Sequence, residues 1–545
     1  MKKTNLIISC IAVCSTCAGQ KIIYSDFEKK DFDRFRFDVI AKYQDRILVY
    51  KATYFGFPSS TQRQRPPQPS YANPDPMANT QNMVSTPDNS ILESTLCIYD
   101  LQMKIIQQTI LPLPKEISGV HFLVYDDYFY MFYQYQRVHS IYCMAIKIDM
   151  LGKIIGSPME LDKTDIMDIH YQSQIYSVIY SENKEHILAF KTDDKNDHFY
   201  MVTSLAFDKD LHLVNKSSNK ISVGGADFLR EFKIDDDGNF IFIGFSETTA
   251  KQDEKRPVLF ILRNGSDRLL YNLTFPPDLY TDDVRLTIDN VNKKYILTSF
   301  YNKKPGGDIC GIYSIVKDMY GTADASVANT NFKDSMGLRA GENAPIKWSN
   351  YYLQHIHLRQ DGGFVAEAMD LFIFPFQQLY DRWNYLQYFS QQVASNYIFY
   401  DPYEYYHYYP WTIWRYFGSN YNFSSSAALI MSFNKRGVLE WMSVMKTPQE
   451  DGFHATLGYK SIVANNLIYF IFNEKIKNKV YLVAQSINTK GQLNTDSRLK
   501  EDLEIKGENR DLTHYPRFAK PVSANEIIFP CRKNRGYVCL AKIEL

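Results

Sequence analysis

The chain lacks an excess of charge of either sign and has no long apolar run after its N-terminal region. Its 545 residues carry 61 basic and 61 acidic side chains, so the formal net charge is +0 at pH 7. Without a basic excess, no global field attracts the protein to nucleic acid or to anionic lipid. No later segment offers the roughly 18 uninterrupted apolar residues of a membrane-spanning helix, so we predict no transmembrane segment.

Cysteine is too scarce for a disulfide framework or a zinc site. Three of the 8 cysteines stand in the N-terminal apolar region, which leaves Cys97, Cys143, Cys310, Cys531 and Cys539. An odd number spread over so long a chain does not indicate a disulfide scaffold, and the spacing suits no zinc motif. Cys531 and Cys539 flank a turn and could face each other across a hairpin, but buried thiols are the preferred interpretation. We predict no metal ion and no cofactor.

The N-terminal residues have the order of a secretory signal. Two lysines precede about a dozen apolar residues, and small residues end the stretch at Cys17, Ala18 and Gly19. We predict that residues 1–19 are the signal peptide and that 20–545 form the mature chain. A lipid anchor at Cys10 is the alternative. The protein is therefore expected to be exported. Its final location would be the periplasm, the outer membrane by association, or the extracellular space.

Aromatic residues and internal repetition are what the chain has in abundance. It contains 41 Tyr and 35 Phe, which favour pleated, half-buried strands. Eight segments place Asn, Asp or Gly at a tight turn and continue with strand-forming residues, which is typical of hairpins. These segments are 42–50, 125–133, 181–190, 235–245, 290–300, 359–368, 463–472 and 523–531.

A second series of eight segments interleaves with the first. In the first seven, an apolar strand runs towards a polar turn and a more polar outer strand, and the eighth has the apolar strand without the turn. These segments are 96–106, 144–155, 205–214, 259–271, 312–321, 429–441, 483–493 and 537–545. The common spacing is about 55 residues, so each repeat holds two hairpins and hence four strands. Such units stacked radially form a β-propeller.

The mature chain resembles the β-propeller superfamily over its whole length, and its repeat is similar to that of exported bacterial propellers. We expect an all-β fold and a single domain of eight four-stranded blades, with seven as the alternative count. The last repeat supplies only three strands, so the N-terminal strand is expected to complete the last blade. A solenoid of hairpins or two sandwich domains are the competing architectures. No WD dipeptide, Kelch set or sialidase Asp-box recurs, so the resemblance implies an architecture without an activity.

Long insertions are expected on one face of the propeller. We name the strands of a blade A to D from the channel outwards. The A–B and C–D turns then share one face, called here the turn face, and the B–C and D–A connections share the other, the loop face. A Pro/Gln/Asn-rich insertion at 57–92, a Tyr/Trp-rich insertion at 371–424 and a link at 319–348 all belong to the loop face. Elaborated loops on a rigid scaffold commonly carry function.

The Tyr/Trp-rich insertion holds the predicted binding site. Tyr and Trp offer a flat apolar face and a polar tip at little conformational cost, which suits recognition of proteins and sugars. Residues 371–399 are assigned mainly to packing against the propeller, and 401–421 to recognition. The predicted binding residues are Tyr403, Tyr405, Tyr406, Tyr408, Tyr409, Trp411, Trp414, Arg415 and Tyr416.

Two smaller features have competing interpretations. His355 and His357 share a face of a predicted strand and could be paired metal ligands, but no third ligand stands at a fixed spacing. A polar strand face is preferred. Residues 234–240 begin like a calcium loop, yet they lack its later acidic ligands and fall where every repeat has a turn. Turn formation is preferred there.

The sequence favours a binding or assembly module over an enzyme. It contains no nucleophile elbow, phosphate-binding loop or zinc-protease motif. The predicted function is an exported non-catalytic module that holds a partner protein or a glycan on the loop face. A polysaccharide hydrolase or lyase with its site at the central channel is one alternative. A structural subunit of a cell-envelope complex, associated peripherally with the envelope, is the other.

Overall fold

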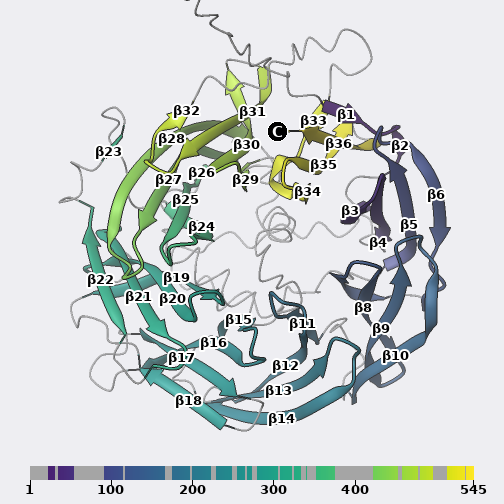
Figure 1. The fold of residues 1–545 in the computed structure, drawn as a ribbon, viewed down its shortest axis with the longest axis horizontal. Coiled ribbons are helices and arrows are strands. Elements are labelled where there is room, and N and C mark those ends of the chain that lie inside the picture. The colour runs from purple at the N-terminus through teal and green to yellow at the C-terminus, as the bar shows by residue number, and fades with distance from the viewer. Residues whose placement is uncertain are drawn as a thin grey trace, which may run out of the picture.

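The structure is a computed structural model. It describes residues 22–30, 35–54, 91–114, 117–165, 175–196, 199–222, 229–247, 255–263, 267–272, 279–304, 307–321, 325–332, 339–340, 351–374, 422–451, 457–476, 479–494, 512–533 and 536–544. Within these residues the strands form eight sheets arranged around a ring, antiparallel except for the short pair β23–β28 (Figure 1). The predicted all-β, eight-bladed propeller is confirmed.

The first four blades follow the repeat from the inner strand A to the outer strand D. Blade 1 consists of β3 (Phe35–Tyr43), β4 (Arg46–Tyr54), β5 (Ile91–Asp100) and β6 (Ile105–Ile110). Blade 2 consists of β7 (Ser118–Val124), β8 (Tyr128–Arg137), β9 (Ser140–Asp149) and β10 (Ile154–Asp165). Blade 3 consists of β11 (Ser177–Tyr180), β12 (His186–Asn196), β13 (Phe199–Asp208) and β14 (Leu213–Ser222). Blade 4 consists of β15 (Arg230–Ile234), β16 (Phe240–Glu247), β17 (Lys255–Arg263) and β18 (Asp267–Asn272).

Blades 5 to 7 continue the pattern, with additions in blade 6. Blade 5 consists of β19 (Tyr280–Asp289), β20 (Lys294–Asn302), β21 (Gly311–Asp318) and β22 (Ser326–Asn331). Blade 6 consists of β24 (Tyr351–Leu358), β25 (Phe364–Asp370), β27 (Asn422–Phe433) and β28 (Leu439–Asp451), to which the short strands β23 (Arg339–Ala340) and β26 (Phe372–Phe374) are added. Blade 7 consists of β29 (Tyr459–Ala464), β30 (Leu467–Ile476), β31 (Lys479–Asn488) and β32 (Leu493–Asn494).

Blade 8 is built from both ends of the chain. Its inner strand is split into β33 (Leu512–His514) and β34 (Lys520–Ser523) around the 3-10 turn η7 (Pro516–Phe518), and β35 (Glu526–Lys533) and β36 (Tyr537–Glu544) follow. The fourth place is taken by β1 (Ile22–Tyr24) and β2 (Glu28–Lys29), both antiparallel to β36. The predicted closure by the N-terminal strand is confirmed, and it removes the open edge that β36 would otherwise present.

The hydrophobic core lies between neighbouring blades. Because side chains alternate across a strand, one strand serves two cores. In β16, Phe240 and Phe242 pack in the cluster between blades 3 and 4, whereas Ile241 and Ile243 pack in the cluster between blades 4 and 5. The ring closes with the same kind of core, since Ile528 of blade 8 packs with the blade 1 core.

The contact between blade 8 and blade 1, called here the closing seam, also contains ion pairs. They join Lys42 to Glu526, Lys520 to Asp38, Lys51 to Glu28 and Lys104 to Asp26. Two of the four acidic partners stand on the N-terminal segment. That segment therefore pairs with blade 8 through its backbone and with blade 1 through its carboxylates.

One strand lies where the sequence suggested only a link. Residues 326–331 form the outer strand β22 of blade 5, inside the segment predicted as a D–A connection at 319–348. All six side chains of β22 are at least partly exposed, so the strand has no buried apolar face that a hydrophobic pattern could reveal. Among the described residues, no helix is long and apolar enough to cross a membrane.

Candidate functional sites on the loop face and the inner strands

The longest connections between strands lie on one face of the ring. On the turn face the longest connection is 319–325, between β21 and β22. The connections at 55–90, 375–421 and 495–511 all join strand B to C or strand D to A, and therefore belong to the loop face. The predicted binding residues between Tyr403 and Tyr416 lie outside the described residues and stay a prediction.

The base of the Tyr/Trp-rich insertion is described. β26 pairs antiparallel with the beginning of β27, so that Phe372 is opposite Ser424 and Phe374 is opposite Asn422. The chain therefore leaves and re-enters blade 6 on neighbouring strands, which stand about 5 Å apart. Both ends of segment 375–421 are consequently fixed at one place on the loop face.

A buried carboxylate holds this base together. One oxygen of Asp370 accepts hydrogen bonds from the Ser425 hydroxyl at 2.8 Å and from the backbone N–H groups of Ser426 at 2.7 Å and Ala427 at 3.0 Å. The other oxygen accepts one from the Ser426 hydroxyl. Asp370 is 2% exposed, so its charge is stabilised by these donors rather than by water.

The two histidines that the sequence analysis singled out, His355 and His357, lie on β24, the inner strand of blade 6. The rings of His355 and His357 are 6.2 Å apart between centroids. His357 Nε2 lies 2.8 Å from Glu367 Oε1 on β25 and 3.1 Å from Ser461 Oγ on β29 of blade 7. Sequence reasoning missed Glu367 and Ser461. The only signal for Glu367 was a charged residue in the middle of a largely apolar strand.

Serine, histidine and glutamate together have the composition of a hydrolytic triad, but their geometry differs from one. In a triad, one ring nitrogen bonds the carboxylate and the other bonds the nucleophile. Here both partners share Nε2 of His357, so the carboxylate cannot orient the ring towards the serine through the opposite nitrogen. No group of three His, Cys, Asp or Glu side chains suited to a metal ion occurs in the described part of the chain. The arrangement joins blades 6 and 7.

An ion pair joins the inner strands of blades 4, 5 and 6. Arg285 on β19 lies 3.5 Å from Glu231 on β15, and its guanidinium donates to the Leu353 carbonyl of β24 at 2.9 Å. The other oxygen of Glu231 accepts from the backbone N–H of Leu286 at 3.0 Å. Glu231 has a φ of 55°, an uncommon left-handed conformation for a non-glycine residue, at a bulge of β15. The bulge turns its carboxylate to the neighbouring blade.

On the loop face, Asp162 of blade 2 holds blade 3. It accepts hydrogen bonds from Lys216 Nζ and from the Tyr176 hydroxyl, each at 2.8 Å, and Lys191 Nζ lies 3.5 Å away. Burial by itself would raise the pKa of Asp162, but the hydrogen bonds from Lys216 and Tyr176 outweigh it and lower the pKa. The carboxylate is therefore charged and already has its partners.

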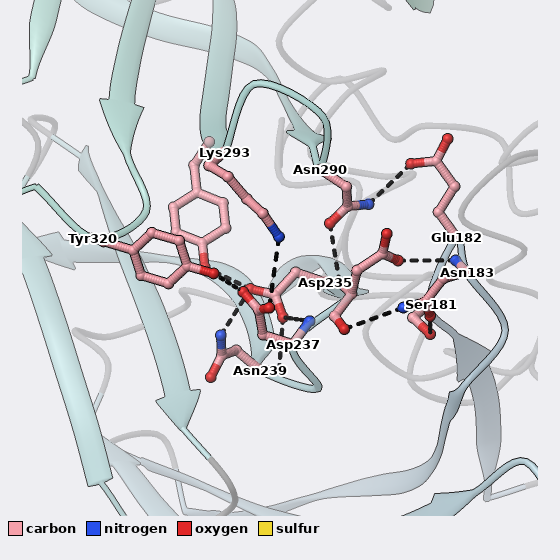
Figure 2. A network of polar contacts seen from close by, with 11 residues as sticks. Ser181, Glu182, Asn183, Asp235, Asp237, Asn239, Asn290, Lys293 and Tyr320 are labelled. Carbon is pink, nitrogen blue, oxygen red and sulfur yellow. Dashed lines mark hydrogen bonds and ion pairs between the residues drawn. The ribbon is translucent and has the colours of Figure 1, made fainter.

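On the turn face, Asp235 folds the segment that resembled a calcium loop (Figure 2). Its Oδ1 accepts from the backbone N–H groups of Asp237 at 3.1 Å and Asn239 at 2.8 Å. Its Oδ2 accepts from the Asn239 amide and from the Tyr295 hydroxyl of blade 5, each at 2.8 Å. Burial, followed by the charge of Asp235, raises the pKa of Tyr295. Asp235 therefore stabilises a turn, which is the interpretation preferred from the sequence over a calcium loop.

The neighbouring turns extend this network over three blades. Asp236 accepts from the Asn183 backbone N–H at 2.9 Å, and the Asn290 amide donates to Glu182 at 2.9 Å (Figure 2). Asp237 accepts from the Tyr320 hydroxyl and lies 3.5 Å from Lys293. The carboxylates of this network thus connect blades 3, 4 and 5 and stiffen the turn face.

Comparisons with known proteins find similarity to solved structures only. No family model matches the chain, and no curated protein matches it. Among solved structures, the WD40 domain of SCAP from fission yeast has a TM-score of 0.39 and 9% identity, with 96% of this chain and 98% of that chain covered. An oligogalacturonate lyase in complex with manganese has a TM-score of 0.31 and 9% identity, with 79% and 97% covered. A thermostable family-43 glycoside hydrolase has a TM-score of 0.24 and 9% identity, with 54% and 94% covered.

Proposed function

We propose that the protein is an exported, non-catalytic binding or assembly module that holds a partner protein or a glycan on its loop face. The observation that carries the proposal is the distribution of connection lengths. Each long connection leaves from the loop face, whereas the turns of the opposite face are short and bonded to one another. A stiff ring that presents long segments on one side is the usual arrangement of a recognition scaffold.

The proposed contact surface is the Tyr/Trp-rich segment with Tyr403, Trp411, Trp414 and Arg415 among its residues. Aromatic side chains bury a large area and keep a polar tip for directional hydrogen bonds, and they dominate the energetics of interfaces. The fixed base at Asp370 supports this role, because a segment anchored at both ends loses less entropy on binding than a free one.

Non-catalytic action is supported by how the described acidic groups are used. Glu231, Asp162 and Asp235 each accept hydrogen bonds from a neighbouring blade. His357 and Glu367 are engaged with each other and with blade 7. Groups held in this way act as contacts between blades, and a reaction would require them to exchange partners.

The test is removal of the segment without disturbing the ring. Because the strands at its two ends are neighbours, residues 375–421 can be replaced by a short Gly/Ser linker. We expect this variant to unfold at the same temperature as the full mature chain and to lose the partner that the full chain captures from its native envelope, or the polysaccharide that it binds. The matched control changes the exposed Lys435 and Arg436 to Ser, in the same blade but on the turn face.

Retention of the partner by the deletion variant, with intact folding, would contradict the proposal. So would loss of the partner in the Lys435/Arg436 control alone. Release of new sugar ends from a polysaccharide by the full mature chain would instead support the hydrolase or lyase alternative. In that case His357→Ala and Glu367→Gln should abolish the release.

A further inference from the structure

Blade 8 contains two cysteines that stand opposite each other on neighbouring strands. Cys531 on β35 and Cys539 on β36 are partners in the strand register. They are 0% and 1% exposed and are free thiols in the structure. Both belong to the core cluster that also contains Ile22 of the N-terminal strand.

The backbone hydrogen bonds define the type of this pair. Leu540 donates its N–H to the Ser25 hydroxyl and accepts from the Ser25 N–H at its carbonyl, so its backbone groups point to the N-terminal segment. Successive residues of a strand point their backbone groups to opposite sides, so those of Cys539 point to Cys531. Such a hydrogen-bonded pair has Cα atoms about 5.5 Å apart. Disulfides join Cα atoms that are about 4.4–6.8 Å apart.

The other described cysteines do not share this arrangement. Cys97 is opposite Val49, and Cys143 is opposite Gln134. Cys310 precedes β21 and is partly exposed. Alignment with a second thiol is thus specific to the β35–β36 hairpin among the described residues.

We propose that Cys531 and Cys539 form an intramolecular disulfide across this hairpin. The oxidant is a disulfide of the glutathione or thiol–disulfide oxidoreductase class. One cysteine thiolate attacks the oxidant and forms a mixed disulfide with release of one thiolate. The second cysteine thiolate attacks the mixed disulfide, forms the Cys531–Cys539 bond and releases a second thiolate. Two protons leave the cysteines, the cysteines are oxidised, and the oxidant disulfide is reduced to two thiols.

Burial determines when this reaction occurs. Desolvation, together with the neighbouring Cys539 thiol, raises the pKa of Cys531 well above its ordinary value, so Cys531 is held as the thiol in the folded hairpin. The bond is therefore made while the hairpin is still open to solvent, during folding. Once formed, it fixes the two strands between the split inner strand and the N-terminal strand, at the place where the ring closes.

The experiment refolds the full mature chain from denaturant in a mixture of reduced and oxidised glutathione, and separately in a reductant. Free thiols are alkylated, and peptides are mapped by mass spectrometry. We expect a linked Cys531–Cys539 peptide that is about 2 Da lighter than the two thiol forms. We also expect a melting temperature about 2 °C above that of the reduced protein, because the bond closes a short loop.

Cys310→Ser is the matched control and should retain the bond, whereas Cys531→Ser should lose both the linked peptide and the oxidant-dependent temperature shift. The wild-type comparison needs no variant, so a folding defect of Cys531→Ser leaves the test intact. Full alkylation of both thiols after oxidative refolding would overturn the proposal, as would a bond from either thiol to glutathione or to another cysteine. None of these outcomes depends on whether a partner binds the loop face.

Discussion

Glu28 on the N-terminal strand forms an ion pair with Lys51, whose ammonium group is buried in blade 1. The same ammonium lies 5.2 Å from the centre of the Tyr99 ring and 5.7 Å from that of Phe37. The N-terminal segment therefore supplies the counter-charge of a lysine that is only 4% exposed. Ring closure and charge compensation therefore depend on the same segment, residues 22–30.

Removal of the Glu28 charge should weaken the closing seam. In Glu28→Gln the Lys51 ammonium stays buried without a counter-charge, so we expect a loss of roughly 2 kcal/mol in the free energy of unfolding, reduced by the partial exposure of Glu28. Urea unfolding followed by tryptophan fluorescence measures it. The double variant Glu28→Gln/Lys51→Met should recover part of the loss. Asp26→Asn, which breaks the exposed pair with Lys104, should cost less than about 1 kcal/mol.

Acid should destabilise the protein through His514. Burial lowers the pKa of His514 from 6.5 to about 4, and its Nε2 lies 2.9 Å from the Tyr24 hydroxyl. Between these two pKa values the unfolded chain binds a proton at His514 and the folded chain does not. The free energy of unfolding is therefore highest above about pH 6.5 and falls as the pH is lowered towards 4. The loss at pH 5 relative to pH 7 should be about 2 kcal/mol.

The measurement compares unfolding free energies of wild type and His514→Gln at pH 7 and pH 5. Gln has no proton to gain in this range, so the variant should lose about 2 kcal/mol less than wild type between the two pH values. Equal losses in both proteins would show that other groups cause the acid sensitivity.

Two aspartates of one turn should differ in their contribution to stability. Asp235 is fully buried and accepts hydrogen bonds from its own turn and from Tyr295, so Asp235→Ala leaves several donors without an acceptor. We expect a loss of about 2–4 kcal/mol. Asp237 is exposed, and Asp237→Ala should cost less than about 1 kcal/mol. Thermal and urea unfolding of the two variants give the comparison, and similar losses would contradict it.

Deletion of residues 20–30 should open the ring. The outer edge of β36 would lose β1 and β2, and an unpaired edge favours association between chains. We expect light scattering to show larger species and a lower melting temperature. A synthetic peptide of residues 20–30, added in excess, should restore the elution volume of the chain without the deletion. A shortened chain that elutes and melts like the full chain would show that the N-terminal strand is dispensable.

The blade architecture could be predicted because each hairpin depends on residues that are close together in the sequence. The turns of blades 4 and 7 place Gly238 at a φ of 81° and Gly491 at 77°, and left-handed residues recur at most of the described hairpin turns. Contacts between blades could not be predicted in this way. His357 contacts both Glu367 and Ser461, and Glu231 pairs with Arg285, because the ring brings together strands that are distant in the sequence. The sequence separations between these residues follow no pattern by which a single sequence could reveal the contacts.

The outer strand β22 escaped prediction for a different reason. All its residues, Ser326–Asn331, are at least partly exposed, and they pair with β21 along the backbone ladder. Hydrophobic periodicity records burial, and an edge strand without a buried face gives no such signal. A similar limit applies to the Tyr/Trp-rich insertion. Its composition predicts a binding surface but does not identify the ligand or partner.

The pairing of β1 with β36 has a consequence for the order of folding. Ser25 and Leu540 are hydrogen-bonded although they are 515 residues apart in the chain. At a synthesis rate of about 5–20 residues per second, the first strand is made roughly half a minute or more before its partner exists. Blades 1 to 7 can form in sequence from local hairpins, but blade 8 depends on the meeting of both ends, which is the slowest kind of contact to form. The closing seam is thus the last part of the ring to form and, by microscopic reversibility, the first expected to open.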